Sequence, residues 1–387
     1  MATAIRTGDA VAQATPNVTT RHAGYLFHPV IDFMLAGGGS LLLALPIILL
    51  IDDEKAVEAT ALGWGLVLSN VLNFPHFANS YQLLYTGIGK RIFGADSTPK
   101  VRLHYIWAGF IAPALILGFM FLAYYLGDPR LLGYAANAMA FTVGWHYVKQ
   151  GYGVIAVLSA IRRIYYSEIE KRLLLVNGYV VWIYSWLQFN KSLHEEELYG
   201  VKFFTFDMPP MLLTVGAIAA GLTTAAVVVA FAVRILVRKQ AVSWNGVVGY
   251  VCALYLWSLA FYYDLIFAIF IPAFHSLQYL LFTWRYQLNK VSSETGESMG
   301  TTAVRLSRPA LMRFAKFVGG GLVLGWVGFM GLPLLFQASL SPDPALFGPA
   351  VFVFIFVMWI NIHHYFIDNV IWRRDNEDVR KYLFAPR

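Results

Sequence analysis

The chain has 387 residues, of which 58% are hydrophobic and 13% are charged, and its formal net charge is +7. Soluble domains contain about twice this fraction of charged residues, so the composition excludes an ordinary soluble domain. Segments with alternating polarity are absent, which excludes a membrane β-barrel. The apolar residues instead form long runs, and a run of about 20 such residues crosses a bilayer as a helix. The sequence therefore predicts an all-α fold, a polytopic bundle of transmembrane helices.

Charge and cysteine content narrow the partners and cofactors. The positive charge lies in loops between apolar runs, so it does not call for a nucleic-acid partner. The single cysteine, Cys252, excludes an intramolecular disulfide and any cysteine-based metal site. The first residues are polar and lack the apolar core of a signal peptide. We expect a mobile N-terminal tail over 1–27, a membrane domain over 28–372 and a cytoplasmic C-terminal tail over 373–387.

The apolar runs predict about ten transmembrane spans. In chain order they cover residues 29–51, 61–86, 105–127, 131–159, 172–190, 210–236, 243–263, 264–287, 314–337 and 347–372. Spans seven and eight adjoin at Tyr263-Asp264, so their connection must be a very tight turn. Span six is rich in Ala, Val and Gly, which predicts a helix that packs closely against a neighbour or faces lipid.

Loop charges alternate along the chain. Loops after even-numbered spans are basic, as at Lys90-Arg91 and Arg162-Arg163, whereas loops after odd-numbered spans are short or acidic, as at Asp52-Asp53-Glu54. Basic loops stay in the cytoplasm, so both termini are predicted to be cytoplasmic. We expect a multi-pass protein of the bacterial inner membrane, surrounded by membrane lipids, and a membrane-protein partner is left open.

Five of the nine histidines lie deep in predicted spans, and all five lie in even-numbered spans. They are His76, His146, His275, His363 and His364. Each precedes the first cytoplasmic Arg or Lys by about 10 to 16 residues, so at about 1.5 Å per residue they share one depth. Ionisable residues inside a membrane are rare and usually face the bundle interior. Several neutral imidazoles at one level offer the nitrogen donors that a metal requires, so we predict a metal site.

Other polar residues accompany these histidines. Lys149 and Tyr279 follow histidines of their own spans by three and four residues, and Asp368 follows His364 by four, so they are candidate catalytic residues. Polar residues also occur inside membrane helices without a catalytic role. Each polar group here could serve an interhelical hydrogen bond, and Lys149 could extend its ammonium to the membrane surface. His363 and His364 point about 100° apart on a straight helix, so one is predicted to bind the metal while the other packs, or the pair serves two sites.

Three functions fit these residues. The first is a membrane oxidoreductase whose histidines bind non-haem iron and which uses O2 on a lipid, carotenoid or other isoprenoid. The second is an electron-transfer protein with a bis-histidine haem, and copper and zinc are further alternatives to iron. The third is a proton-coupled transporter in which the intramembrane His, Lys and Asp residues form a relay. The H-x-x-H-H boxes of membrane desaturases are absent, and only the pair His363-His364 is similar to part of such a box.

Overall fold

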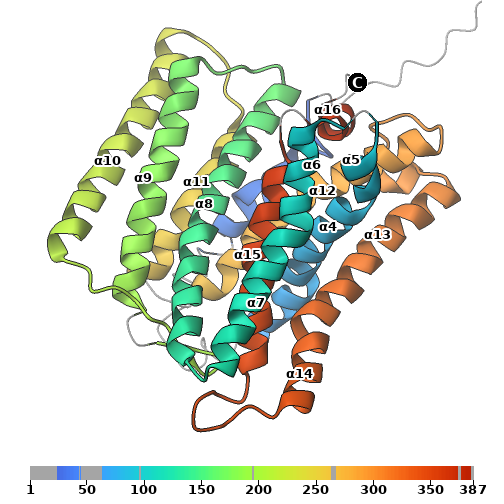
Figure 1. The fold of residues 1–387 in the computed structure, drawn as a ribbon. Coiled ribbons are helices and arrows are strands. Elements are labelled where there is room, and N and C mark those ends of the chain that lie inside the picture. The colour runs from blue at the N-terminus through green and yellow to red at the C-terminus, as the bar shows by residue number, and fades with distance from the viewer. Residues whose placement is uncertain are drawn as a thin grey trace, which may run out of the picture.

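The computed structural model describes residues 24–42, 44, 63–95, 97–193, 196–262, 267–373 and 376–384. These residues are helical almost throughout, and the only sheet among them is a hairpin of β1 (Glu197–Leu198) and β2 (Val201–Lys202). Figure 1 shows long helices lying side by side in a bundle. The predicted all-α class is confirmed for the described part of the chain.

Helical segments follow one another along the chain with short connections. The first half contains α1 (Pro29–Phe33), η1 (Met34–Gly38), η2 (Ser69–Asn73), α4 (Phe74–Tyr85), α5 (Ile88–Phe93), α6 (Pro99–Ile106), η3 (Trp107–Ile111), α7 (Ala112–Tyr125), α8 (Pro129–Ile161) and α9 (Glu168–Ser192). The second half contains α10 (Pro210–Ala232), η4 (Val233–Val237), α11 (Trp244–Tyr262), α12 (Phe267–Glu294), η5 (Ala303–Arg305), α13 (Arg308–Trp326), η6 (Val327–Gly331), α14 (Leu332–Leu340), α15 (Val351–Ile371) and α16 (Glu377–Phe384).

Five helices in the described residues are long and apolar enough to cross a membrane. They are Pro99–Tyr125, Pro210–Val237, Trp244–Tyr262, Arg308–Leu340 and Val351–Ile371. Helices α8, α9 and α12 are also long, with 33, 25 and 28 residues, but their polar and aromatic residues lower their hydropathy. The count of about ten spans therefore stays a prediction. The predicted turn at Tyr263-Asp264 and the acidic loop at Asp52-Asp53-Glu54 lie outside the described residues.

Three helices of the described chain contain a widened π-helical turn just before a proline. The turns η2, η3 and η6 are followed within two residues by Pro75, Pro113 and Pro333. Proline has no backbone N–H and its ring clashes with the preceding turn, and a π turn accommodates both effects without breaking the helix. One of these turns lies directly before His76, so it sets the angle at which this histidine enters the bundle.

Basic segments gather at one end of the bundle. The guanidinium of Arg162 lies 5.4 Å from the Tyr25 ring, and that of Arg285 lies 5.5 Å from the Phe27 ring. Arg91 forms an ion pair with Asp378 of α16. Figure 1 shows α5 and α16 at this end, whereas α14 ends at the opposite one. The first and last described segments thus lie at the basic end, as the loop charges predict, and the side of the membrane remains a prediction.

The predicted C-terminal tail, 373–387, contains a helix that packs on the bundle. Val379, Tyr382 and Leu383 of α16 are buried, and Asn289 of α12 donates a hydrogen bond of 2.6 Å to the carbonyl oxygen of Tyr382. This amphipathic helix covers the end of α12. The predicted N-terminal tail, 1–27, lies outside the described residues up to residue 23.

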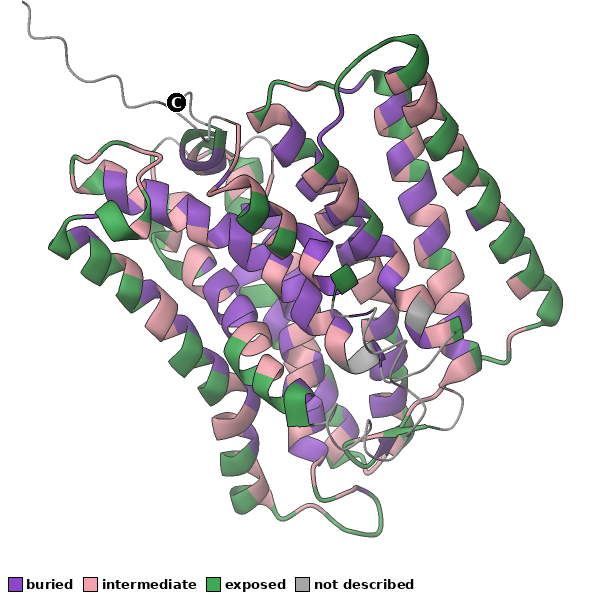
Figure 2. Ribbon diagram, turned by 180° about the vertical axis from the view of Figure 1, so that it is seen from behind, coloured by how far each residue is buried: buried purple, intermediate pink, exposed green. Residues whose placement is uncertain are grey.

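Burial differs sharply between helices, as Figure 2 shows. Helix α15 lies in the interior, where Phe352, Phe354 and Met358 pack against α7 and α8 with no measurable exposure. Helix α10 lies at the edge of the bundle and contacts mainly α9, and Ala220 is its only buried residue. This agrees with the prediction that span six faces lipid or packs against a single neighbour.

Candidate metal centre

Four helices bring one histidine each to a common point in the bundle interior. Helices α4, α8, α12 and α15 contact one another around this point. We call the group the four-histidine cluster: His76, His146, His275 and His364. One ring nitrogen from each lies within 4.8 Å of the other three, and all four residues are buried. Histidines of four separate predicted spans thus meet at one depth, as the residue count along each span predicts.

The two shortest nitrogen–nitrogen distances fit neighbouring ligands of a single ion. His76 Nε2 lies 2.9 Å from His364 Nε2, and His146 Nε2 lies 3.1 Å from His275 Nε2. Two ligands at right angles on an ion with bonds of about 2.1 Å are about 3.0 Å apart. A hydrogen bond between two imidazoles gives the same distance, so either pair alone would be ambiguous. It is the convergence of four rings on one point that favours an ion.

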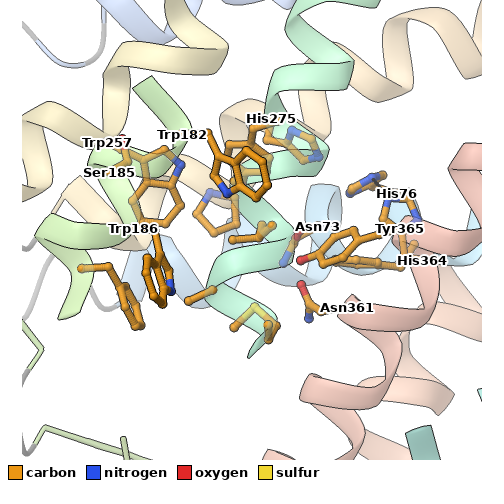
Figure 3. Close-up of a pocket in the computed structure, with 18 of the residues that line it drawn as sticks. Asn73, His76, Trp182, Ser185, Trp186, Trp257, His275, Asn361, His364 and Tyr365 are labelled. Carbon is orange, nitrogen blue, oxygen red and sulfur yellow. Dashed lines mark hydrogen bonds between the residues drawn. The ribbon is translucent and has the colours of Figure 1, made fainter. Parts of the chain in front are cut away.

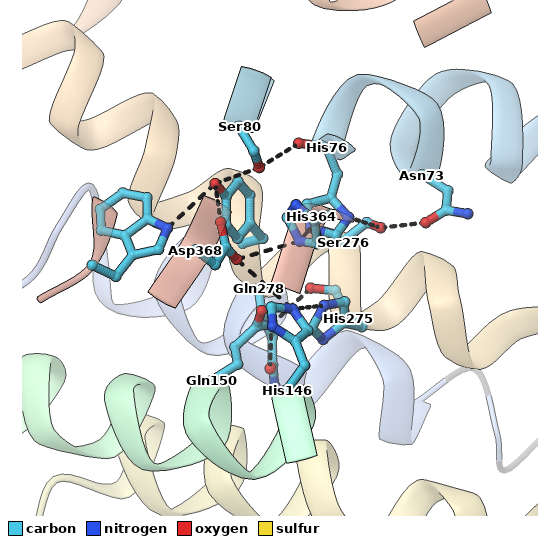
Figure 4. Close-up of polar contacts among 12 residues, drawn as sticks. Asn73, His76, Ser80, His146, Gln150, His275, Ser276, Gln278, His364 and Asp368 are labelled. Carbon is cyan, nitrogen blue, oxygen red and sulfur yellow. Dashed lines mark hydrogen bonds and ion pairs between the residues drawn. The ribbon is translucent and has the colours of Figure 1, made fainter. Parts of the chain in front are cut away.

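A carboxylate also faces the cluster. Asp368 Oδ2 lies 3.3 Å from His364 Nε2 and 3.8 Å from His146 Nε2. Figure 4 shows Asp368 beside the histidines, on the side where Ser80 lies. The Nε2 atoms of His364 and His146 thus face both another histidine and this carboxylate oxygen. Asp368 is therefore a candidate fifth ligand.

Tyr279 holds Asp368 in place. Its hydroxyl accepts hydrogen bonds from Ser80 Oγ at 2.6 Å and from Trp372 Nε1 at 3.3 Å. It donates to Asp368 Oδ1 at 3.0 Å. Because a phenol oxygen accepts through its lone pairs and has a single proton, this pattern directs the proton toward Asp368. Tyr279 therefore contacts Asp368 beside the cluster, and both residues lie near the histidines, as their spacing in the sequence predicts.

His363 lies outside the cluster. Its Nε2 donates to the carbonyl oxygen of Ala108 at 2.7 Å, and its Nδ1 accepts from the Tyr81 hydroxyl at 2.7 Å. Both ring nitrogens are therefore used. Of the two adjacent histidines, His364 faces the cluster and His363 packs toward η3, as the angle between neighbouring residues on a helix requires.

Lys149 is not brought to the cluster, although it was predicted to share a face of the helix with His146, and a catalytic role for it stays a prediction. Its side chain is exposed. The ammonium lies 5.9 Å from the Trp145 ring centre and 5.6 Å from that of Tyr179. The three-residue spacing from His146 leaves it about 60° away on the helix, on the side of α9.

Residues of neighbouring helices orient the cluster histidines. Helical periodicity in the sequence did not predict these contacts. Ser276 Oγ lies 3.0 Å from His76 Nδ1. Tyr147 stacks on His275 at 4.0 Å between ring centres, and Tyr365 stacks on His146 at 4.8 Å. Each of these residues follows a cluster histidine directly in the sequence but contacts the histidine of another helix. Sequence adjacency was the one available signal, because spacing within a span says nothing about contacts between spans.

Two glutamines near the cluster donate hydrogen bonds to backbone carbonyl oxygens and not to the ring nitrogens of the histidines. Gln150 Nε2 donates to the carbonyl oxygen of His275 at 2.9 Å and to Gln278 Oε1 at 3.2 Å. Gln278 Nε2 donates to the carbonyl oxygens of Ala36 and Gly249, at 2.5 and 3.0 Å. The glutamines thus connect η1, α8, α11 and α12 around the site.

A cavity of about 150 Å³ lies beside the cluster. Its wall includes aromatic residues such as Trp182, Trp186 and Trp257, and it contains no Asp, Glu, Lys or Arg among the described residues. Figure 3 shows His76 and His364 at one end of this space and the tryptophans toward the other, with His275 between them. Lining residues of α8 and α15 precede His146 and His364, so the cavity extends away from the basic end of the bundle. Asp368, four residues after His364, lies toward the basic end.

No protein-family model matches this sequence, and no curated protein or solved structure was found to be similar to it. Function is therefore argued from the chemistry of the site. The four-histidine cluster could hold a metal ion, and the neighbouring apolar cavity could hold an uncharged molecule next to that ion.

Proposed function

We propose that the chain is an integral membrane oxidoreductase that binds non-haem iron in the four-histidine cluster and uses O2 to oxidise an apolar molecule. The observation that carries the proposal is the convergence of four buried imidazoles within 4.8 Å, at one end of an uncharged cavity. Polar groups in a membrane interior are costly and usually have a function. Metal coordination would offset that cost for all four rings at once.

The donor set favours iron over zinc. Structural zinc sites have four ligands, and catalytic zinc sites have three protein ligands and a water. Four imidazoles and the Asp368 carboxylate would supply five donors, which leaves one position free in an octahedral shell. Iron bound by nitrogen and carboxylate ligands with an open position supplies the redox chemistry that O2 activation requires.

The residues around the cluster would have two further roles, namely binding of the substrate and support of the metal ion. The aromatic wall of the cavity would exclude water and charged molecules and position an apolar substrate, a lipid or isoprenoid that enters from the bilayer. Asp368 would bind the ion or hold a proton beside it, and Tyr279 would fix the orientation of that carboxylate. The carboxylate and the cavity lie on different sides of the cluster, so substrate binding and proton exchange would not compete for space.

The alternative functions fit less well. A bis-histidine haem occupies the equatorial positions of its iron with the porphyrin, so two further imidazoles within 4.8 Å would collide with the ring. A proton relay through Lys149 would require that residue to approach the histidines, whereas it is exposed on the side of α9. Copper would also accept imidazole ligands, and the metal must be identified by measurement.

Metal analysis and a visible spectrum of the purified full-length protein test this proposal, provided that no chelator is used. We expect about one iron per chain and no intense Soret band. A Soret band would assign the histidines to haem. Protein that contains no metal and no haem would overturn the enzyme proposal and favour transport.

A further inference from the structure

The size and lining of the cavity restrict what it can hold. Its volume of about 150 Å³ equals that of an engineered apolar cavity known to bind benzene, so it admits one ring-sized group. Aromatic side chains form much of its wall, and none of the described lining residues carries a full charge. None of the described lining side chains would offset the charge of an ion placed there, so the lining favours a neutral occupant.

One edge of the cavity is polar. Asn73 and Asn361 line it, and Tyr365 lies one helical turn after Asn361 on the same face of α15. Figure 3 shows these three side chains near His364. Asn73 accepts a hydrogen bond from Ser276 at 3.0 Å through Oδ1, and Asn361 donates to the carbonyl oxygen of Val357 at 2.8 Å through Nδ2. The amide nitrogen of Asn73 and the amide oxygen of Asn361 are then left to interact with a ligand.

The Tyr365 hydroxyl is a third group that could hydrogen-bond to a ligand in the cavity. It is buried and has no hydrogen-bond partner among the described residues, although its ring stacks on His146. A buried hydroxyl without a partner destabilises a protein, so natural proteins rarely retain one without a reason. Tyr365 lines the cavity, so a hydrogen-bonding group on a ligand there would give this hydroxyl its partner.

We infer that the substrate is a neutral, ring-bearing apolar molecule with a hydroxyl or carbonyl group that accepts hydrogen bonds from Tyr365 and Asn73. A hydroxyl group would also donate to the amide oxygen of Asn361. The inference deepens the proposed function and rests on it for the reaction, but the binding step itself requires no turnover. The polar edge adjoins His364, so it would hold the oxygen-bearing part of the ring near the four-histidine cluster. Tyr365 is then a specificity-determining residue.

Binding of matched one-ring probes tests the substrate class. Cyclohexanone, methylcyclohexane and cyclohexanecarboxylate have similar sizes and differ in polarity and charge, and their dissociation constants can be measured by ligand-observed NMR on the purified metal-containing protein. We expect the ketone to bind about fivefold more tightly than the hydrocarbon, as one net hydrogen bond provides. The carboxylate should bind at least about tenfold more weakly than the ketone. Equal binding of ketone and hydrocarbon, or tightest binding of the carboxylate, would overturn the inference.

Substitutions locate the binding. Tyr365→Phe should lower the preference for the ketone, because the Asn73 amide is then the remaining donor to its carbonyl. Thermal stability should be unchanged or higher, because the substitution removes a hydroxyl that lacks a partner in the free protein. Ala140→Leu should weaken binding of both neutral probes because it fills the cavity. Ala138→Leu, at an exposed position of the same helix, is the matched control. A Tyr365→Phe protein that keeps the full preference, or an Ala140→Leu protein that binds like the control, would contradict the inference.

Failure of this inference is distinguishable from failure of the proposed function. Protein without iron that still binds the ketone selectively would refute the oxidoreductase but retain the substrate site. Protein with iron in which the probes do not bind, or do not compete for the cavity, would refute the substrate site alone.

Discussion

Helices α10 and α15 are both apolar enough to cross a membrane, yet they occupy opposite positions in the bundle. In the most apolar part of each, 6% of the residues are buried in Pro210–Val237 and 67% in Val351–Ile371. The more exposed helix is also the more apolar one. Lipid is as apolar as leucine, so a leucine gains little by leaving lipid for the protein interior. Histidine and aspartate side chains gain much more free energy than leucine when they leave lipid for the protein interior. The polar residues of α15 therefore indicate that this helix lies in the interior.

The two helices are also held in different ways. Helix α10 is joined to its neighbours by a polar network in which Asn177 donates to Thr223 and Thr224 at 3.2 and 3.1 Å. Its continuation η4 adds the buried ion pair of Arg234 with Glu170 of α9, at 3.0 Å. Helix α15 combines packed phenylalanines with the contacts of His364 and Asp368 at the candidate metal centre. We therefore expect substitutions on α15 to affect both metal binding and stability, whereas those on α10 should have small effects on stability alone.

The largest effect is expected at His364. His364→Ala should remove almost all bound metal, because it deletes one of four converging ligands while the helix remains packed. His363→Ala is the matched control, since this adjacent histidine is equally buried and uses both nitrogens elsewhere. Elemental analysis of both folded variants measures the difference. Equal metal loss in the two proteins would show that the cluster does not bind the metal.

A smaller effect on the same helix is expected at Asp368. Asp368→Asn should weaken metal affinity about 10- to 100-fold, as loss of a residue supporting a metal site typically does. Competition with a chelator of known affinity would measure it. Tyr279→Phe should weaken affinity less than Asp368→Asn, because it removes only the hydrogen bond that orients the carboxylate. The reverse order would mean that Tyr279 acts on the ion directly.

Substitutions of packed apolar residues should also affect α15 and α10 differently, through the free energy of unfolding. Phe354→Ala on α15 should destabilise the protein by about 3 kcal/mol, because it leaves a cavity in the interior. Leu222→Ala on the exposed face of α10 should change stability by less than about 0.5 kcal/mol. Reversible unfolding in detergent or bicelles measures both. Similar losses at the two positions would show that α10 is covered by protein in the membrane.

The smallest effect is expected in the network that joins α10 to α9. Thr224→Val keeps the shape of the side chain and removes its hydrogen bonds to Asn177 and Tyr255. We expect a loss of about 0.6 kcal/mol, near the average for such bonds in membrane proteins. Thr214→Val, whose hydroxyl bonds only within its own helix, should have almost no effect. A Thr224→Val protein as stable as Thr214→Val would mean that packing alone holds α10.

The sequence predicts the helical class, the peripheral position of span six and the meeting of histidines from four spans. These features follow from composition and from a count of residues along straight helices, which fixes depth. The same count separates His363 from His364 by about 100°, although it cannot say which of them faces inward.

Rotation about each helix axis could not be predicted with the same reliability. Lys149 is three residues from His146, and an error of about 60° was enough to place it on the wrong side of α8. Ser276, Tyr147 and Tyr365 contact histidines of other helices, and those contacts depend on how α4, α8, α12 and α15 pack together. Packing between helices is set by side-chain shape, which periodicity does not encode.

X-ray absorption at the iron edge of the purified wild-type protein tests the proposed iron site most directly, because it counts the ligands of the bound ion. We predict five or six nitrogen and oxygen neighbours at about 2.1 Å, with outer-shell scattering from about four imidazoles. A shell with two imidazoles or fewer, or the rigid scattering pattern of a porphyrin, would contradict it.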